Sequence, residues 1–175
     1  NHEINPNLKP YCPSIVGGQF YYLYMFEDLY SRKIVGYEVH EAESGEYAAQ
    51  LLQRTQLREQ CLHKPLVLHS DNGAPMKAQT MPSRGFASLD EARLWVDRFV
   101  RWYNTEHRHS KLRFVTPEQR HNGEDAVLLE QRKRVLEQAK QSMPSRWGTR
   151  PVRNCEPVGP TTLNPETELP MRQAA

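Results

Sequence analysis

The sequence predicts a mixed α/β (α+β) fold in which a small sheet is followed by helices and a proline-rich tail. Three observations carry this prediction. Two runs of strand type, a helix and a third short strand follow one another between residues 19 and 68. Capped, amphipathic helices then dominate residues 88–142. Six prolines follow Met143, and such a density favours an extended tail over residues 143–175.

The strands are expected in the first 68 residues. Residues 1–18 contain Pro6, Pro10 and Pro13, and prolines at this density disfavour a regular strand or helix there. Residues 20–26 are apolar or aromatic on both alternations, which is typical of a strand covered on both faces. After a polar turn, residues 34–40 predict a second, antiparallel strand. Pro65 ends any preceding helix, and the apolar residues 66–68 that follow it predict a short buried strand.

Ser44, Ser88 and Thr116 are each placed to cap the N-terminus of a helix. The first two helices extend to about residue 61 and about residue 104, and a further helix is expected over about residues 124–142. The apolar stripe of helix 88–104 comprises Ala92, Trp95, Val96, Phe99, Trp102 and Tyr103. The helix over 124–142 is expected to bury Val127, Leu128, Val135 and Leu136.

Composition limits the class of protein. A chain with 38% hydrophobic and 25% charged residues is typical of a soluble globular protein, and a net charge of +2 is compatible with nucleic-acid binding without arguing for it. The sequence contains neither an apolar run long enough to span a bilayer nor a secretory pattern. Cys12, Cys61 and Cys155 are far apart and odd in number, so they predict neither a disulfide framework nor a metal-ligand pair, and a reducing, cytoplasmic location is expected by default.

Asp71 is the candidate catalytic and metal-binding residue. It lies in the run 69–73 (HSDNG), directly after the third predicted strand, and strand ends of this kind point at the crevice where α/β sheets bind ligands. A carboxylate on a rigid strand suits Mg²⁺, and Asn72-Gly73 permits the tight turn that exposes it. The alternative is a turn in which the aspartate only stabilises its own backbone.

The segment 107–113 is the candidate DNA-binding site, because its basic or titratable side chains can hold phosphates. These residues are His107, Arg108, His109, Lys111 and Arg113. The alternative is a solvated basic loop, and a solvated helix face is also the interpretation of the run 132–134 (RKR). Asp28 is expected to play a structural part, either capping the turn that follows it or pairing with Arg32. The histidine spacings do not predict a zinc site.

Several blocks in series resemble the integrase core of bacterial insertion-sequence transposases. They are Tyr21–Tyr24, Asp28–Gly36, Glu38–His40, Leu68–Lys77, Trp102–Asn104, His107–His109 and Thr116–Arg120. The resemblance covers about residues 10–165 in order. It implies a ribonuclease-H-like fold and a triad of two aspartates and one glutamate. The triad would bind two Mg²⁺ (or Mn²⁺) ions about 3.5–4 Å apart, which activate water or a DNA 3′ hydroxyl against a phosphodiester.

The chain departs from this family at two of the three carboxylates. Asp71 matches the middle aspartate, but Leu8 stands where the resemblance places the first. Glu3 cannot easily substitute, because five residues along a strand span roughly 16 Å and an odd offset points to the other face. The segment from Asn72 to Leu89 contains no acidic residue, so the strand and glutamate-bearing helix expected there are interpreted as deleted. Asp90 and Glu91 come next, but they begin a helix.

The resemblance divides the chain into four parts: a degenerate start of the core (1–18), a partial integrase catalytic core (19–80), a helical C-terminal part of the core (81–142) and an extended tail (143–175). It implies DNA transposition or integration, with DNA as the partner and with activity lost in this copy. One alternative is a non-catalytic module that binds DNA, or that interferes with an intact transposase copy or forms a homo-oligomer. Another is a functionless pseudogene product whose chain barely folds.

The interpreted deletion has a structural consequence. The strand over 66–68 loses the neighbour expected on its far side, which leaves an apolar edge with unpaired backbone groups, prone to aggregation. Aromatic surface around Tyr22 and Tyr24 is then expected to be uncovered. The alternative is that helix 88–104 swings in and covers the gap with Trp95, Phe99 and Trp102.

Overall fold

The computed structural model describes residues 2–68 and 81–159, with the backbone alone for residues 2–10. Four strands form one sheet in the order β3-β2-β1-β4, in which β1 pairs antiparallel with β2 and parallel with β4. The strands are β1 (His2–Pro13), β2 (Phe20–Asp28), β3 (Ile34–His40) and β4 (Leu66–Leu68). The helices are α1 (Gly45–Arg58), α2 (Leu89–Thr105), α3 (Pro117–His121), α4 (Asp125–Ser142) and α5 (Pro144–Trp147), with a short 3₁₀ turn η1 (Ser110–Leu112).

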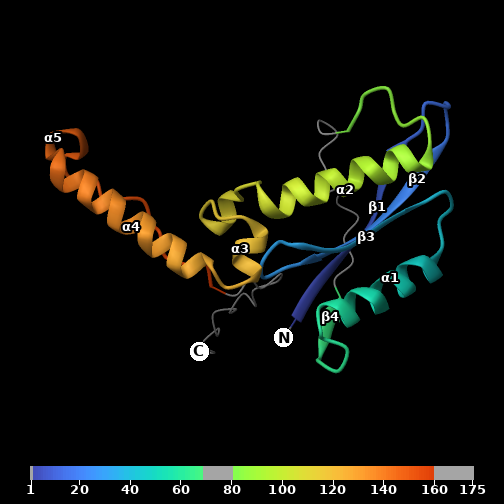
Figure 1. Ribbon diagram of the computed structural model, residues 1–175, viewed down its shortest axis with the longest axis horizontal. Helices are drawn as coiled ribbons and strands as arrows, with labels where there is room; N and C mark the ends of the chain where they lie inside the picture. Colours follow the sequence, from blue (N-terminus) through green and yellow to red (C-terminus); the bar gives the residue numbers. More distant parts are fainter. Residues whose placement is uncertain (1, 69–80, 160–175) are drawn as a thin grey trace, which may run out of the picture.

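The sheet lies between α1 and α2, one on each face (Figure 1). The apolar character of β2 on both alternations explains this arrangement. Leu23 and Met25 pack in the core under α2, whereas Tyr24 and Phe26 pack under α1. α1 crosses β3 so closely that a side chain at Gly36 would collide with Thr55. The prediction of a strand covered on both faces is therefore confirmed.

β1 is a strand, so the expectation that prolines exclude regular structure from residues 1–18 is wrong. Its register against β2 shifts between Leu8 and Tyr11, and Pro10 falls inside that irregularity, where the ladder is interrupted. Pro13 is the last residue of the strand. The long partner strand β2 therefore organises a proline-containing segment that has little strand propensity of its own.

β4 lies at the edge of the sheet rather than in its interior. Its predicted position at residues 66–68 is confirmed, but the prediction that it is buried is wrong, since Val67 and Leu68 are 41% and 44% exposed. Among the described residues β4 pairs only with β1. Tyr24 is nevertheless buried beneath α1 and Tyr22 is partly buried, so the expected uncovering of these aromatic residues is also wrong.

The predicted N-caps Ser44, Ser88 and Thr116 are all confirmed, and each side chain accepts a hydrogen bond from the first turn of its helix. The predicted stripe of α2 needs correction, because Val100 and Asn104 are buried while Trp102 is 42% exposed. Residues spaced by four along α2 face the sheet, which turns Trp102 outward. The helix packs against β2 and β3 and does not swing across to β4.

α4 projects away from the sheet as an arm (Figure 1). Residues 150–158, here called the return segment, run back along it and are anchored where Lys140 donates to the Arg150 carbonyl and Arg120 to the Val158 carbonyl. Only the side of α4 that carries Leu129 is buried. Val127 and Val135 are 62% and 63% exposed, so their predicted burial is wrong, because no other element covers that side of the arm in the described structure.

Candidate nucleic-acid interface

The predicted DNA-binding segment forms a closed loop after α2, here called the basic loop (residues 107–115). The His109 amide donates to the Val115 carbonyl at 3.1 Å and the Phe114 amide to the His109 carbonyl at 3.0 Å. Inside this ring of hydrogen bonds lies η1. Leu112 and Val115 are buried against Leu129, so apolar side chains fasten the loop to the base of the arm. The loop is therefore a fixed platform for its exposed side chains.

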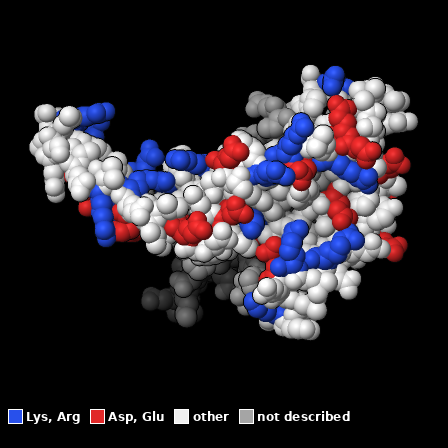
Figure 2. All heavy atoms as spheres, in the orientation of Figure 1, with Lys and Arg blue, Asp and Glu red and all other residues white. Residues whose placement is uncertain are grey.

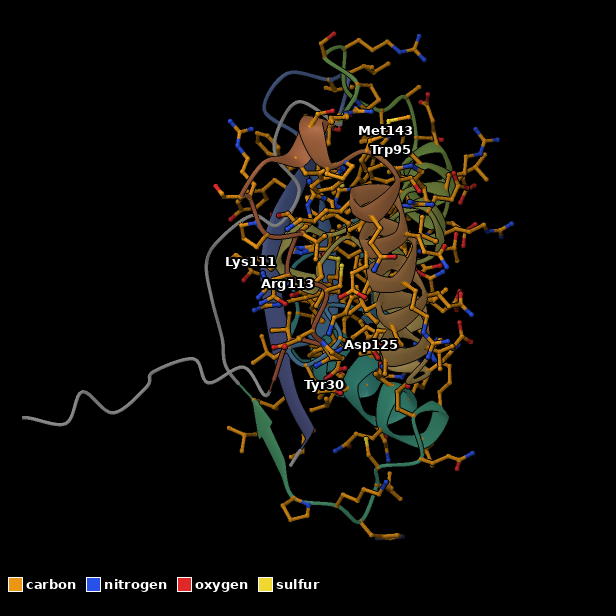
Figure 3. The ribbon with its side chains drawn as sticks, turned by 90° about the vertical axis from the view of Figure 1, so that its left-hand side faces the viewer. Tyr30, Trp95, Lys111, Arg113, Asp125 and Met143 are labelled. Carbon is orange, nitrogen blue, oxygen red and sulfur yellow. The ribbon has the colours of Figure 1, made fainter. Side chains whose placement is uncertain are left out.

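Three of the five predicted DNA-binding side chains are exposed on this platform: Arg108, Lys111 and Arg113. In Figure 3, Lys111 and Arg113 lie next to each other on the side where β1 runs. On the face drawn in Figure 2, cations and carboxylates are interspersed over α1 and α2. The exposed cations of the basic loop can attract phosphates.

The two predicted histidines lie differently from the three cations. His107 stacks on Tyr103, with ring centroids 5.5 Å apart, and its ring also contacts Trp102 at 5.1 Å. Burial holds the pKa of His109 below its ordinary value of 6.5, and Arg32, His107 and Lys111 lower the pKa further. His109 is therefore largely neutral at pH 7. Both histidines extend the aromatic side of α2 rather than supply fixed positive charge.

The backbone of the basic loop is strained at two successive residues. Arg113 and Phe114 have φ values of 58° and 64°, in the left-handed region that non-glycine residues avoid. Arg132 of α4 donates hydrogen bonds to the carbonyl oxygens of both residues. The guanidinium of Arg153, in the return segment, lies 5.0 Å from the centre of the Phe114 ring. The expected solvated face of residues 132–134 therefore needs correction at Arg132, because its contacts depend on tertiary packing that no local pattern encodes.

A second polar cluster joins the turn after β2 to α3 and α1. Asp28 accepts hydrogen bonds from the amide and hydroxyl of Ser31, so its predicted role as a cap of this turn is confirmed. Arg32 pairs instead with the buried Glu27, at 3.2 Å. His121 lies 3.3 Å from Asp28 through Nδ1 and 3.1 Å from Glu59 through Nε2. The hydroxyl of Ser31 is no exposed nucleophile, because the residue is fully buried.

The pKa values of three residues in this cluster are shifted from their ordinary values. The hydrogen bond that His121 donates to the Asp28 carboxylate raises the pKa of His121 above its ordinary value of 6.5, although burial opposes the shift. Burial acts on Asp28 in the direction that raises its pKa, but hydrogen bonds from His121 and Ser31 outweigh it and leave the pKa below 3.8. Burial raises the pKa of Glu27, against the effect of Arg32. The cluster is a charged structural junction.

Asp71, the predicted catalytic residue, lies outside the described residues. Leu8, where the resemblance places the first carboxylate, is in β1 opposite Tyr24. β4 ends at Leu68, which pairs with Ile4, four residues before Leu8 along β1. The described residues contain no group of three or more histidine, cysteine or acidic side chains able to hold a metal ion.

The next acids along the chain are engaged at the start of α2. Asp90 is 91% exposed beside Arg93, and Glu91 accepts a hydrogen bond from the Ala87 amide at 2.6 Å. Glu91 therefore caps the helix, as predicted from its position, although the bonded amide is that of Ala87 rather than Ser88. The residues present do not fit the two-metal carboxylate set that the resemblance implies.

A family model described as the integrase core domain matches residues 8–113. The chain belongs to this family. The match extends from Leu8 in β1 to Arg113 in the basic loop, and it confirms the predicted retroviral-integrase-type core and the ribonuclease-H-like fold. Membership associates the chain with DNA integration and recombination, with DNA as a partner, and with a family that generally uses divalent metals.

Neither the curated proteins nor the solved structures contain a match to this chain. Within the described parts of the chain, none of the helices has the length and apolar character needed to cross a membrane.

Proposed function

We propose that this chain is a DNA-binding remnant of an insertion-sequence transposase that no longer cleaves or joins DNA. The observation that carries the proposal is the basic loop, where Arg108, Lys111 and Arg113 project from a hydrogen-bonded platform. Integrase cores act on DNA, and exposed cations on a fixed backbone supply the phosphate contacts that give affinity without sequence preference.

The loss of catalysis rests on the residues that occupy the catalytic positions. A two-metal centre needs negative charge from several sides to hold two divalent cations. The chain has Leu8 in place of the first carboxylate and no acid between Asp71 and Asp90. One aspartate is too little charge to hold the Mg²⁺ or Mn²⁺ pair. Of the three catalytic carboxylates that the resemblance implies, Asp71 is the one that we assign to this chain.

The location and partners follow from the same proposal. Such a protein would reside in the bacterial cytoplasm and associate with the nucleoid when bound to DNA. Interference with an intact transposase copy is the alternative role, and co-purification of the two proteins would favour it. Reversible, cooperative unfolding of the purified chain would argue against a functionless product that barely folds.

The proposal is tested by fluorescence anisotropy with a labelled DNA duplex at several salt concentrations. Three phosphate contacts predict that the logarithm of the association constant falls with the logarithm of salt with a slope of about −2.7. The triple variant Arg108→Ala, Lys111→Ala, Arg113→Ala is expected to lose most of the binding.

The matched control is the triple variant Lys64→Ala, Arg98→Ala, Arg146→Ala. It removes the same charge from exposed positions on other segments and is expected to bind nearly as well as the wild type. Equal affinities of the two triple variants would exclude the basic loop as the DNA-binding site.

A further inference from the structure

The strained pair Arg113–Phe114 is an unusual feature of the basic loop. A left-handed conformation costs a non-glycine residue roughly 1.4 kcal/mol, equivalent to a factor of about ten in an equilibrium constant, and two in succession persist only where the surroundings enforce them. Strain of this kind gathers at ligand-binding sites. Here it falls on a residue that carries one of the three exposed cations and on its neighbour.

The groups that enforce the strain come from outside the loop. Arg132 lies on α4 and donates one hydrogen bond to the Arg113 carbonyl and one, of 3.3 Å, to the Phe114 carbonyl. A guanidinium presents several donors in a rigid fork, so a single side chain can hold two successive carbonyl groups in this geometry. Arg153 adds a cation–π contact on the Phe114 ring, and Cys155 packs against the apolar base of the loop.

These residues all lie beyond Arg113, where the match to the integrase core ends. We infer that Arg132 is a positioning residue for DNA binding: it holds the left-handed backbone of Arg113 and Phe114, so that the basic loop is ordered before DNA arrives. The inference rests on the proposed function of the loop and gives the arm and the return segment a role in it. Because the loop is already ordered in the free protein, DNA binding does not have to supply the free energy of ordering it.

The experiment compares Arg132→Gln with Arg134→Gln. Both variants remove one positive charge from α4, but Arg134 is 70% exposed, and its ion pair in the described part of the chain is within its own helix, with Glu130. Hydrogen exchange at the amides of residues 113–115 is measured on each free protein. Affinity for a labelled duplex is then measured as a function of salt.

We expect Arg132→Gln to accelerate exchange at these amides and to bind duplex about tenfold more weakly than Arg134→Gln, with an unchanged salt dependence. The salt dependence stays the same because the bound loop makes the same phosphate contacts. Arg153→Gln, which removes the contact on the Phe114 ring, is expected to change exchange and affinity in the same direction by less.

Two results would overturn the positioning role. One is exchange or affinity equal to that of Arg134→Gln. The other is a salt slope reduced by about 0.9, the value for one lost phosphate contact, without faster exchange, since this identifies Arg132 as a direct contact. If the wild-type chain does not bind duplex, the proposed function fails instead, and the exchange rates then report separately whether Arg132 holds the loop.

Discussion

Replacing Arg120 is expected to destabilise the base of the arm severely. Its side chain is only 4% exposed, and it joins α3 to the buried carboxylate of Asp125 at the start of α4 and to the Val158 carbonyl. Its guanidinium also lies 4.1 Å from the centre of the Tyr30 ring. Arg120→Ala leaves Asp125 buried without its partner, which costs about 3–5 kcal/mol. That is a large part of the roughly 5–15 kcal/mol by which domains are stable.

Urea unfolding, followed by tryptophan fluorescence and far-ultraviolet circular dichroism, measures this loss. With a urea dependence of about 2 kcal/mol per molar, the midpoint should fall by about 2 M. Arg134→Ala is the control, because an exposed ion pair contributes at most about 1 kcal/mol. The double variant Arg120→Met, Asp125→Leu should recover much of the loss, since no buried charge remains. A loss in Arg120→Ala no larger than in Arg134→Ala would refute this reasoning.

Two further predictions concern the polar junction and the sheet edge. Because the folded pKa of His121 is raised, its stabilising contribution is complete below about pH 6.5 and is lost as pH rises through the folded pKa. The free energy of unfolding should therefore fall above pH 6.5 in the wild type and in the exposed-site control His63→Gln, but fall less in His121→Gln. Equal dependence of this free energy on pH in all three proteins would contradict the stabilising role of His121. For β4, whose side chains at Val67 and Leu68 are exposed, we expect fast amide exchange and concentration-dependent aggregation that Val67→Lys reduces. Strong protection of these amides in a monomer would show that the edge is already paired.

Features set by local chemistry were predictable from the sequence. The N-caps Ser44, Ser88 and Thr116 depend on a side chain and the amides that follow within three residues, so sequence spacing identifies them. The two-sided apolar character of residues 20–26 likewise predicts a strand between two layers. The division of the chain at residues 18, 80 and 142 stays a prediction.

Features set by tertiary contacts were not predictable in the same way. The periodicity of α2 does not determine whether Trp102 or Val100 faces the sheet, because both belong to plausible apolar stripes. β1 forms against its prolines because β2 supplies a long antiparallel partner. The composition of residues 107–113 predicts a basic loop, but it does not predict that His107 stacks on Tyr103. It also does not predict that Arg132, nineteen residues after Arg113, holds the loop backbone.

The central claim is that this protein binds DNA but does not cleave or join it. A nicking assay on supercoiled plasmid, at protein concentrations that saturate DNA binding, tests this claim most directly. With Mg²⁺ or Mn²⁺ present, the wild-type protein should leave the plasmid supercoiled, and Asp71→Ala should bind with unchanged affinity. Leu8→Asp should also remain inactive, because the third carboxylate is still absent. Metal-dependent nicking or joining by the wild type that disappears in Asp71→Ala would contradict the proposal.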